Sequence, residues 1–517
     1  MQDKAETPIW MRGNYEPVRE EATAFDLPVE GSIPPELCGL YARNGANPRE
    51  GETAHWFLGD GMVHGVSIRN GKAEWYRNRW VRTPCFYGQK LTPETALDIR
   101  CSVANTTVIS HAKRILTLAE NALPMEINRE LDTVGFHDFG GALKTPFTAH
   151  PKICPLTGEL HFFGYRVVPP FLTYHVADAE GILLRSLDVP VKGPTMMHDF
   201  ALTSGHVIFM ELPVVFDIQR ALNASIPFTW SDTYGARLGI LPRGAAIEEL
   251  RWVEVEPCYV YHVANAFETA DGTITVEVAR YQSAWRPDGK RSGARLTRWR
   301  IPPGTSKAEE VQLDHQKIEF PRIDDRNTGR PQRIVYALAN NRDLENGSFG
   351  GLLRYDLKSG ETQYHDFGES RTPSEFAMAP APGAGEDEGW LIGFVYDRTR
   401  DASDLVILMR SASAPGLLLA FSFQGASLKV STAPGFQRQH CRLSGFPVSQ
   451  RRIWLATVEN GVHELHRNFG DVTPTITKLD LPPHGLASCR MESALLAICR
   501  SSGGRSRTLC SERSSAT

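Results

Sequence analysis

The sequence lacks the features that mark a membrane, secreted or nucleic-acid-binding protein. Its 517 residues contain no run of 18 or more apolar residues, so we expect no membrane-spanning helix. The first residues, MQDKAETPIWMRGNYEP, have no apolar stretch of the kind a signal peptide needs, and no leader segment is predicted. Acidic and basic residues nearly balance, at a net charge of −4, which gives no reason to expect nucleic acid as a partner.

Cysteine patterning is also absent. The nine cysteines form no CxxC pair and follow no regular spacing. Scattered thiols of this kind are typical of a reducing compartment, so the sequence predicts a cytoplasmic protein without a disulfide framework.

What the sequence does contain is a long series of short alternating strands joined by tight turns. Asn70-Gly71 and Lys358-Ser359-Gly360 each separate two strand-like runs, and the 44 glycines and 34 prolines suit many such turns. Hairpins recur roughly every 40–60 residues, which is close to the spacing of propeller blades. Helical pattern is scarce, with residues 231–241 and 93–100 as the best short candidates. We therefore predict an all-β propeller with long loops.

Three histidines recur in similar strand-like settings. His150, His198 and His262 are separated by 48 and 64 residues, which fits one histidine on each of three blades. Any single histidine of this kind is more often structural than functional. The inner strands of all blades meet at a propeller axis, however, so the three could converge on one metal ion. Neutral imidazole suits Fe, Zn, Cu and Ni alike, and ligand type alone leaves the metal open.

Three glutamates stand in otherwise apolar or turn-bounded strands: Glu120, Glu319 and Glu375. A glutamate among apolar residues is rarely buried without a partner. Metal-bound imidazoles usually donate their second N–H to a carboxylate, which makes these glutamates candidates for orienting the histidines.

Eleven segments together resemble the carotenoid cleavage oxygenases, the family that also includes stilbene-cleaving dioxygenases and retinoid isomerohydrolases. They occur in family order across about residues 30–408, and they are LYARNGANP, HWFLGDGMVHG, NRWVRT, LTLAENALP, FTAHPKICPLTGEL, MMHDFALT, YHVANAFE, IEFPRID, PSEF, EDEGWLIGFVYD and SDLVIL.

The resemblance implies a seven-bladed β-propeller with a loop and helix cap over an axial metal site. In this family four histidines hold Fe(II) without a carboxylate ligand. His150, His198 and His262 match three of these ligands, and Glu120, Glu319 and Glu375 match the carboxylates that orient ligand histidines. His55, His64, His161 and His365 match no ligand position and are interpreted as structural or surface residues.

The implied reaction is cleavage of a conjugated C=C bond by O2 to give two carbonyl products. The substrate would be an apolar polyene or an aryl-alkene. In the stilbene-cleaving branch a lysine precedes the first orienting glutamate, whereas this chain has Ala119, which favours a carotenoid or apocarotenoid. Such a substrate dissolves in lipid, so an apolar patch at a tunnel mouth would allow peripheral contact with a membrane.

The resemblance stops after Leu408. Residues 409–517 carry thirteen Lys and Arg against six Asp and Glu, while the rest of the chain carries 43 against 54. The GFHG-like motif that supplies the family's fourth histidine is absent, and His440 and His484 are the nearest candidates. We therefore divide the chain into a propeller domain, residues 1–408, and a divergent segment, residues 409–517, with a reading-frame shift near Leu408 as the hypothesis.

Several functions remain open on these residues. The first is the iron dioxygenase, the second a non-oxidative isomerohydrolase on the same scaffold, and the third a propeller without catalysis that lacks its fourth ligand. A calcium-dependent propeller hydrolase is less compatible, because its site needs carboxylate and amide oxygens rather than three histidines. The oligomeric state is not predicted.

Overall fold

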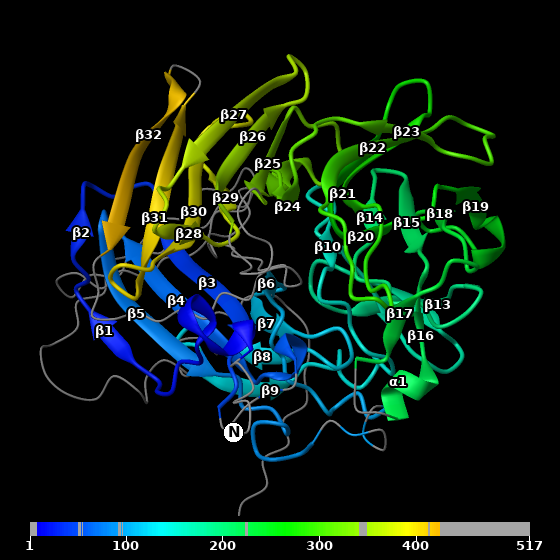
Figure 1. Cartoon of the computed structure of the whole chain (residues 1–517), viewed down its shortest axis with the longest axis horizontal. Helices are drawn as coiled ribbons and strands as arrows, with labels where there is room; N and C mark the ends of the chain where they lie inside the picture. Colours follow the sequence, from blue (N-terminus) through cyan, green and yellow to red (C-terminus); the bar gives the residue numbers. More distant parts are fainter. Residues whose placement is uncertain are drawn as a thin grey trace, which may run out of the picture. The chain divides into compact units, whose positions relative to one another are not determined.

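The computed structural model describes residues 8–49, 53, 55–90, 92, 95, 97–222, 226–340, 349–411 and 414–423. In this part of the chain the strands form seven sheets of four or more strands around a common axis (Figure 1), as expected for a seven-bladed propeller. A further pair, β16 and β17, lies outside the seven sheets.

The first four sheets follow one another along the chain, and each has four antiparallel strands. Their strands are β1 Thr23–Phe25, β3 Gly39–Ala46, β4 Gly61–Arg69 and β5 Lys72–Trp80; then β6 Thr107–His111, β7 Arg114–Leu118, β8 Met125–Ile127 and β9 Thr133–Phe136; then β10 Lys152–Ile153, β11 Leu160–Tyr165, β12 Leu172–Ala177 and β13 Leu183–Asp188; then β14 Ala201–Leu202, β15 His206–Glu211, β18 Arg237–Pro242 and β19 Arg251–Glu254.

The remaining three sheets continue the same pattern. Their strands are β20 Tyr259–Glu268, β21 Ile274–Tyr281, β22 Arg295–Ile301 and β23 Glu309–Gln312; then β24 Ile318–Arg322, β25 Ile334–Ala339, β26 Gly351–Asp356 and β27 Glu361–Asp366; then β28 Arg371–Pro373, β29 Ala377–Pro380, β30 Gly389–Asp397, β31 Ala402–Ser411, β32 Ala414–Phe423 and the early strand β2 Val29–Glu30.

Helical structure is short in the described residues. It comprises α1, Ile218–Leu222, and five 3-10 helices: η1 Ile9–Met11, η2 Gly13–Tyr15, η3 Trp56–Leu58, η4 Ile247–Glu249 and η5 Asp325–Asn327. The connection from β15 to β18 carries α1 between β16, Val214–Phe216, and β17, Phe228–Trp230. No helix in the described residues is long and apolar enough to cross a membrane.

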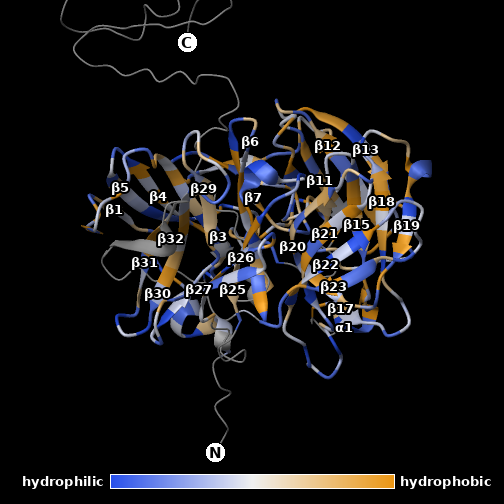
Figure 2. Ribbon diagram, turned by 90° about the horizontal axis from the view of Figure 1, so that it is seen from above, coloured by the Kyte–Doolittle hydropathy of each residue, from blue (hydrophilic) through white to orange (hydrophobic). Residues whose placement is uncertain are grey.

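Hydrophobic clusters fill the spaces between neighbouring sheets and hold the ring together. Val63 and Met125 belong to one such cluster, between the first and second sheets. Tyr41 and Phe394 belong to another, between the first and seventh, with ring centroids 5.4 Å apart. Hydrophobic positions follow the strands in Figure 2, whereas many connecting loops are hydrophilic. Burial between sheets, rather than within one, therefore provides the main stabilisation of the ring.

The seventh sheet joins the two ends of the propeller. β2 pairs antiparallel with β32, with Val29 opposite Phe423, and β32 pairs with β31. β31 runs across Leu408, the position at which the family resemblance stops, without a break. Sheets built from both ends of a chain close a propeller without a free gap between its first and last blades.

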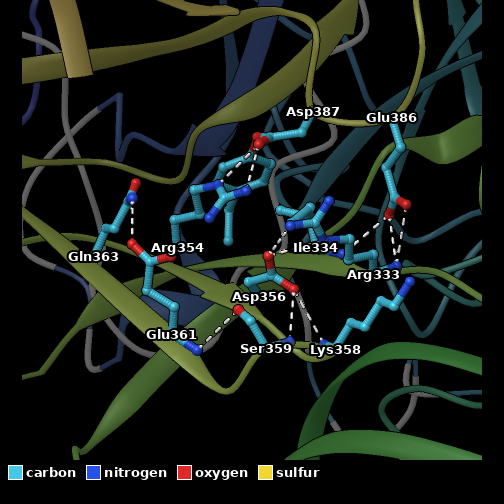
Figure 3. Close-up of polar contacts among 11 residues, drawn as sticks. Arg333, Ile334, Arg354, Asp356, Lys358, Ser359, Glu361, Gln363, Glu386 and Asp387 are labelled. Carbon is cyan, nitrogen blue, oxygen red and sulfur yellow. Dashed lines mark hydrogen bonds and ion pairs between the residues drawn. The ribbon is translucent and has the colours of Figure 1, made fainter. Parts of the chain in front are cut away.

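Polar contacts also connect the sixth and seventh sheets (Figure 3). In the loop between β29 and β30, the Glu386 carboxylate accepts the backbone N–H groups of Arg333 and Ile334, at 2.8 and 3.0 Å. The next residue, Asp387, accepts from the Arg354 guanidinium at 3.0 Å. Because these carboxylates meet β25 and β26, the loop fixes one blade against the next.

The predicted turns are confirmed, and one predicted helix is wrong. Asn70 and Gly71 join β4 to β5, with φ angles of 50° and 73° that suit a two-residue hairpin. Residues 231–241 are not helical: they form a turn at Gly235, whose φ is 78°, and then enter β18. Pairing of β18 with β15 outweighs the weak helical pattern here. The other candidate, residues 93–100, lies partly outside the described residues, and residues 97, 99 and 100 are in turns.

Candidate metal centre

The candidate site residues lie at the starts of consecutive sheets. His150 precedes β10 by two residues and His198 precedes β14 by three, while His262 lies within β20. Because β14 contacts β20 and β20 contacts β24, the first strands of neighbouring sheets approach one another. Residues distant in sequence are thereby brought to the axis of the ring.

Irregular pairing aims the side chains at this axis. The register of β20 against β21 shifts between Val260 and Val263, on either side of His262. The register of β24 against β25 shifts between Glu319 and Arg322, and Phe320 between them has a φ of 53°. Bulges turn a side chain away from the regular alternation of a strand, and here they occur at both members of a histidine–glutamate pair.

The three histidines form one buried cluster. Their candidate ligand atoms all lie within 4.8 Å of one another, and all three residues are buried. The Nε2 atoms of His150 and His198 are 2.9 Å apart. The ring of His262 has its centroid 5.4 Å from that of His150 and 5.3 Å from that of His198.

Two of the predicted glutamates contact these histidines. Glu120 Oε1 lies against His198 Nδ1, and Glu319 Oε2 lies against His262 Nδ1. A carboxylate at Nδ1 places the proton there and leaves the Nε2 lone pair available. The structure therefore brings one predicted glutamate to each of two predicted histidines.

Tyrosine hydroxyls hold both carboxylates, a feature that sequence reasoning missed. Tyr165 donates to Glu120 Oε2 at 2.6 Å, and Tyr281 donates to Glu319 Oε1 at 2.9 Å. Burial, and then the negative charge of the neighbouring glutamate, raise the pKa of each phenol well above its ordinary value. Both hydroxyls therefore stay protonated and donate. Tyr165 ends β11, the second strand after His150, but its sequence context did not distinguish it from other strand aromatics.

Glu375 behaves differently from the other two glutamates. It lies in the seventh sheet between β28 and β29, and it is 3% exposed. Its Oε1 is 3.6 Å from Nε of Arg322. His440 and His484, the candidates for a fourth ligand, lie outside the described residues.

The chemistry of the donor set fits a divalent metal ion. Imidazole nitrogen is a ligand for Fe, Zn, Cu and Ni. Two nitrogens that each bind one ion at about 2.1 Å lie no more than about 4.2 Å apart. The 2.9 Å between His150 and His198 is within this limit. Carboxylates behind two of the rings are the partners that metal-bound histidines usually have.

Comparisons with known proteins agree on one family. Residues 15–413 match the family described as RPE65, retinal pigment epithelial membrane protein. A carotenoid cleavage oxygenase of Mycobacterium tuberculosis is 35% identical over 464 residues, covering 77% of this chain and 92% of the relative. Carotenoid 9,10(9',10')-cleavage dioxygenase 1 of Arabidopsis thaliana is 32% identical and covers 77% of this chain and 84% of its own length.

Solved structures give the same result. The lignostilbene dioxygenase of Pseudomonas brassicacearum superposes with a TM-score of 0.74 at 29% identity, covering 84% of this chain and 100% of that protein. Cobalt-substituted Synechocystis ACO gives 0.73 at 26% identity, covering 84% and 98%. A seven-bladed propeller with a histidine triad at its axis is the class these features define. The chain belongs to the carotenoid cleavage oxygenase family, and its homologues are dioxygenases or oxygenases.

Proposed function

We propose that this chain is a non-haem Fe(II) dioxygenase that cleaves a conjugated C=C bond of a carotenoid or apocarotenoid. The observation that carries the proposal is the buried histidine triad with carboxylates behind two of its members. His150, His198 and His262 bind the iron, and Glu120 and Glu319 orient His198 and His262. Neutral imidazoles leave the ion its full +2 charge, and an iron held this way supplies the activation of O2.

The reaction needs no reactant other than the alkene and O2. One C=C bond breaks, two C=O bonds form, and each product receives one atom of O2, so no external reductant is needed. The residues of the chain have three tasks: they hold the ligands, fix the ring orientations, and exclude water. Burial of all three histidines and of Glu319 serves the last task, because hydration would weaken every electrostatic interaction in the site.

Aromatic side chains next to the triad support an apolar, elongated substrate. The Tyr165 ring has its centroid 6.2 Å from that of Phe228 in β17, and Phe228 in turn is 6.1 Å from Phe216. The insertion that carries β16 and β17 therefore reaches the residue that holds Glu120. Aromatic faces of this kind pack well against a polyene or an aryl ring.

Ala119 favours the carotenoid or apocarotenoid substrate. The side chain is buried directly before Glu120 and offers no group that could bind a phenolic oxygen. A stilbene-type aryl-alkene is the second candidate, because the lignostilbene dioxygenase is among the solved structures that superpose well.

The test is anaerobic loading with Fe(II), followed by measurement of O2 uptake with an apocarotenoid and with a hydroxystilbene. We expect one O2 consumed for each pair of aldehydes, and 18O2 should label both products. Faster turnover of the hydroxystilbene would contradict the substrate assignment. Conversion of a retinoid ester without O2 uptake would instead indicate an isomerohydrolase.

The C-terminal segment carries a second proposal. We infer that a reading-frame shift near Leu408 replaced the native sequence of residues 409–517 and removed the fourth ligand histidine. The family match ends at residue 413, and the charge balance changes sign at the same place. The chain would then be a propeller with little catalysis. Resequencing of the coding region decides this: an intact frame shared with homologues would refute it.

We also propose a cytoplasmic protein that touches membranes at its surface to collect substrate. The five cysteines of the described part, Cys38, Cys85, Cys101, Cys154 and Cys258, are free thiols, as a reducing compartment requires. Ile218 and Leu222 on α1 are 55% and 65% exposed. Sedimentation with neutral phospholipid vesicles should fall for the double variant Ile218→Glu/Leu222→Glu; unchanged sedimentation would contradict this contact.

A further inference from the structure

A buried ion pair lies directly beside the triad in sequence and links the three segments that carry it. Lys152 follows His150 by two residues, and Asp199 follows His198 by one. Lys152 Nζ is 2.6 Å from Asp199 Oδ1, and the side chains of the two residues are 10% and 0% exposed. Neither residue was singled out from the sequence.

Asp199 also binds the third ligand segment. Its Oδ2 accepts the backbone N–H of Val263, the residue after His262, at 2.8 Å. Its Oδ1 accepts the backbone N–H of Phe200 at 2.8 Å. One carboxylate therefore contacts the chain next to His198, next to His262 and, through Lys152, next to His150.

The contact to Val263 falls where regular strand pairing is interrupted. The register of β20 shifts on both sides of Val263, so regular pairing with β21 does not by itself fix the backbone around His262. A carboxylate that accepts this N–H supplies a hydrogen bond at the bulge. The position of the His262 backbone then depends on Asp199.

A cavity is lined by residues that closely follow the triad histidines and Glu319 along the chain. Its lining includes Pro151, Lys152, Ala201, Val263, Pro321 and Arg322, each of which follows a triad histidine or Glu319 by one to three residues. Lys152 is part of this lining, and its partner Asp199 directly follows His198 along the chain. A charged pair in so buried a place is costly to maintain unless its hydrogen bonds are satisfied.

We propose that Asp199, neutralised by Lys152, is a positioning residue for the metal centre. It holds the three ligand-bearing segments at a fixed separation before any metal binds, so that the imidazoles are preorganised. It does not contact substrate or metal. This inference rests on the proposed function only in that the triad binds a divalent ion.

The test uses the full chain, cobalt(II) as the metal, and the variant Asp199→Asn. Asparagine keeps the size and one acceptor oxygen but removes the charge opposite Lys152. We expect the dissociation constant for cobalt to rise at least about tenfold, as for other outer partners of metal ligands. The visible cobalt spectrum should change as well, and amide exchange at Phe200 and Val263 should speed up in the metal-free protein.

Glu211→Gln is the matched control. Glu211 is equally buried, pairs with Arg237, and accepts the backbone N–H of Lys192, but it has no recorded contact with the triad. A similar loss of stability in urea is expected, with cobalt affinity within about twofold of the parent chain, because distant sites act independently. Equal weakening of cobalt binding by both variants, or no effect of Asp199→Asn, would overturn the proposal.

Two outcomes need a further comparison: a variant that does not fold, and a parent chain that binds no metal. If Asp199→Asn does not fold, Lys152→Gln is compared with Arg237→Gln by the same criteria. If the parent chain binds no cobalt and no iron, the proposed function fails, whereas the inference is then judged by amide exchange alone. Unchanged exchange at Phe200 and Val263 in the variant would overturn it.

Discussion

Two groups of buried histidines differ in the partner of each ring. At the axis, His198 and His262 have carboxylates, Glu120 and Glu319, at Nδ1. At three histidines in the strands of the blades, the partner at Nδ1 is a hydroxyl. His64 Nδ1 lies 2.9 Å from the Tyr76 hydroxyl, and the ring nitrogens of two further histidines follow the same pattern: His161 with Tyr174 at 2.6 Å, and His175 with Ser186 and Thr145 at 2.8 Å each.

Among these five rings, the difference parallels the proposed division between metal ligands and structural residues. A carboxylate fixes the proton at Nδ1 and raises the basicity of Nε2, which a metal ion requires. A hydroxyl can donate or accept, so it satisfies a neutral ring without making it a better ligand. Burial lowers the pKa of His64 and His161 to about 3 and that of His175 to about 4, and these rings stay neutral.

The largest effect is expected from removing a triad histidine. His262→Ala should abolish stoichiometric iron binding and lower the turnover rate at least about a thousandfold, because the metal supplies the chemistry. Iron content and O2 uptake measure this. His175→Ala, from the hydroxyl-paired group, is the control and should retain iron. Loss of iron in both variants would show that the two groups do not differ as described.

A smaller effect is expected at the carboxylates. Glu319→Gln should weaken metal binding by about 10–100-fold, because the amide cannot stabilise the Nδ1 proton of His262 as an anion does. Glu375→Gln should leave metal affinity within about twofold, since Glu375 faces Arg322. Its effect should appear as a loss of about 3 kcal/mol in the free energy of unfolding, because a buried charge loses its partner. Metal weakening by Glu375→Gln would place a fourth ligand beside it.

The hydroxyl-paired group predicts sensitivity to mild acid. Each of these histidines binds a proton more readily in the unfolded chain, whose histidine pKa is about 6.5, than in the fold. Their stabilisation is therefore complete above that pH and is lost as the pH falls from about 6.5 towards about 4 for His175 and about 3 for His64 and His161.

Urea unfolding at pH 7 and pH 5 measures the loss, which is on the order of 2 kcal/mol for each fully buried histidine. Asp397, whose pKa is lowered to about 2 by hydrogen bonds from Thr399 and Arg400 despite an opposing effect of burial, changes stability only below about pH 4 and so lies outside this window. His64→Gln should reduce the difference in stability between the two pH values. A difference that is the same in the parent chain and in this variant would contradict the assignment.

The smallest effect is expected from removing one hydroxyl. Tyr174→Phe leaves His161 Nδ1 without this partner and should cost about 1–2 kcal/mol in the free energy of unfolding. Metal content should not change. The matching change at the axis, Tyr281→Phe, frees one oxygen of Glu319 and should lower metal affinity as well as stability. If Tyr174→Phe and Tyr281→Phe changed stability and metal affinity in the same way, the distinction between hydroxyl-paired and carboxylate-paired histidines would be wrong.

Sequence reasoning predicted the propeller and the triad because both depend on repeated local patterns. Hairpin turns such as Asn70-Gly71 specify strand pairs, and similar histidine settings recur at blade-like intervals. The partner of each histidine was harder to predict, since Glu120 and His198 belong to different parts of the chain and meet only in the folded ring. Asp199 and Lys152 were not predicted for the same reason. An acidic residue next to a histidine in sequence is usually interpreted as a solvent-exposed charge, and only the structure shows that it is buried.

The pairing of β2 with β32 has a consequence for the synthesis of the protein. Residues 29–30 leave the ribosome early, but their partner strand is complete only when residue 423 has been made. During most of translation the nascent chain is an open arc with an uncovered strand edge. Such an intermediate invites association with neighbouring chains, so chaperone supply during expression should govern the yield of folded protein more than the stability of the finished ring.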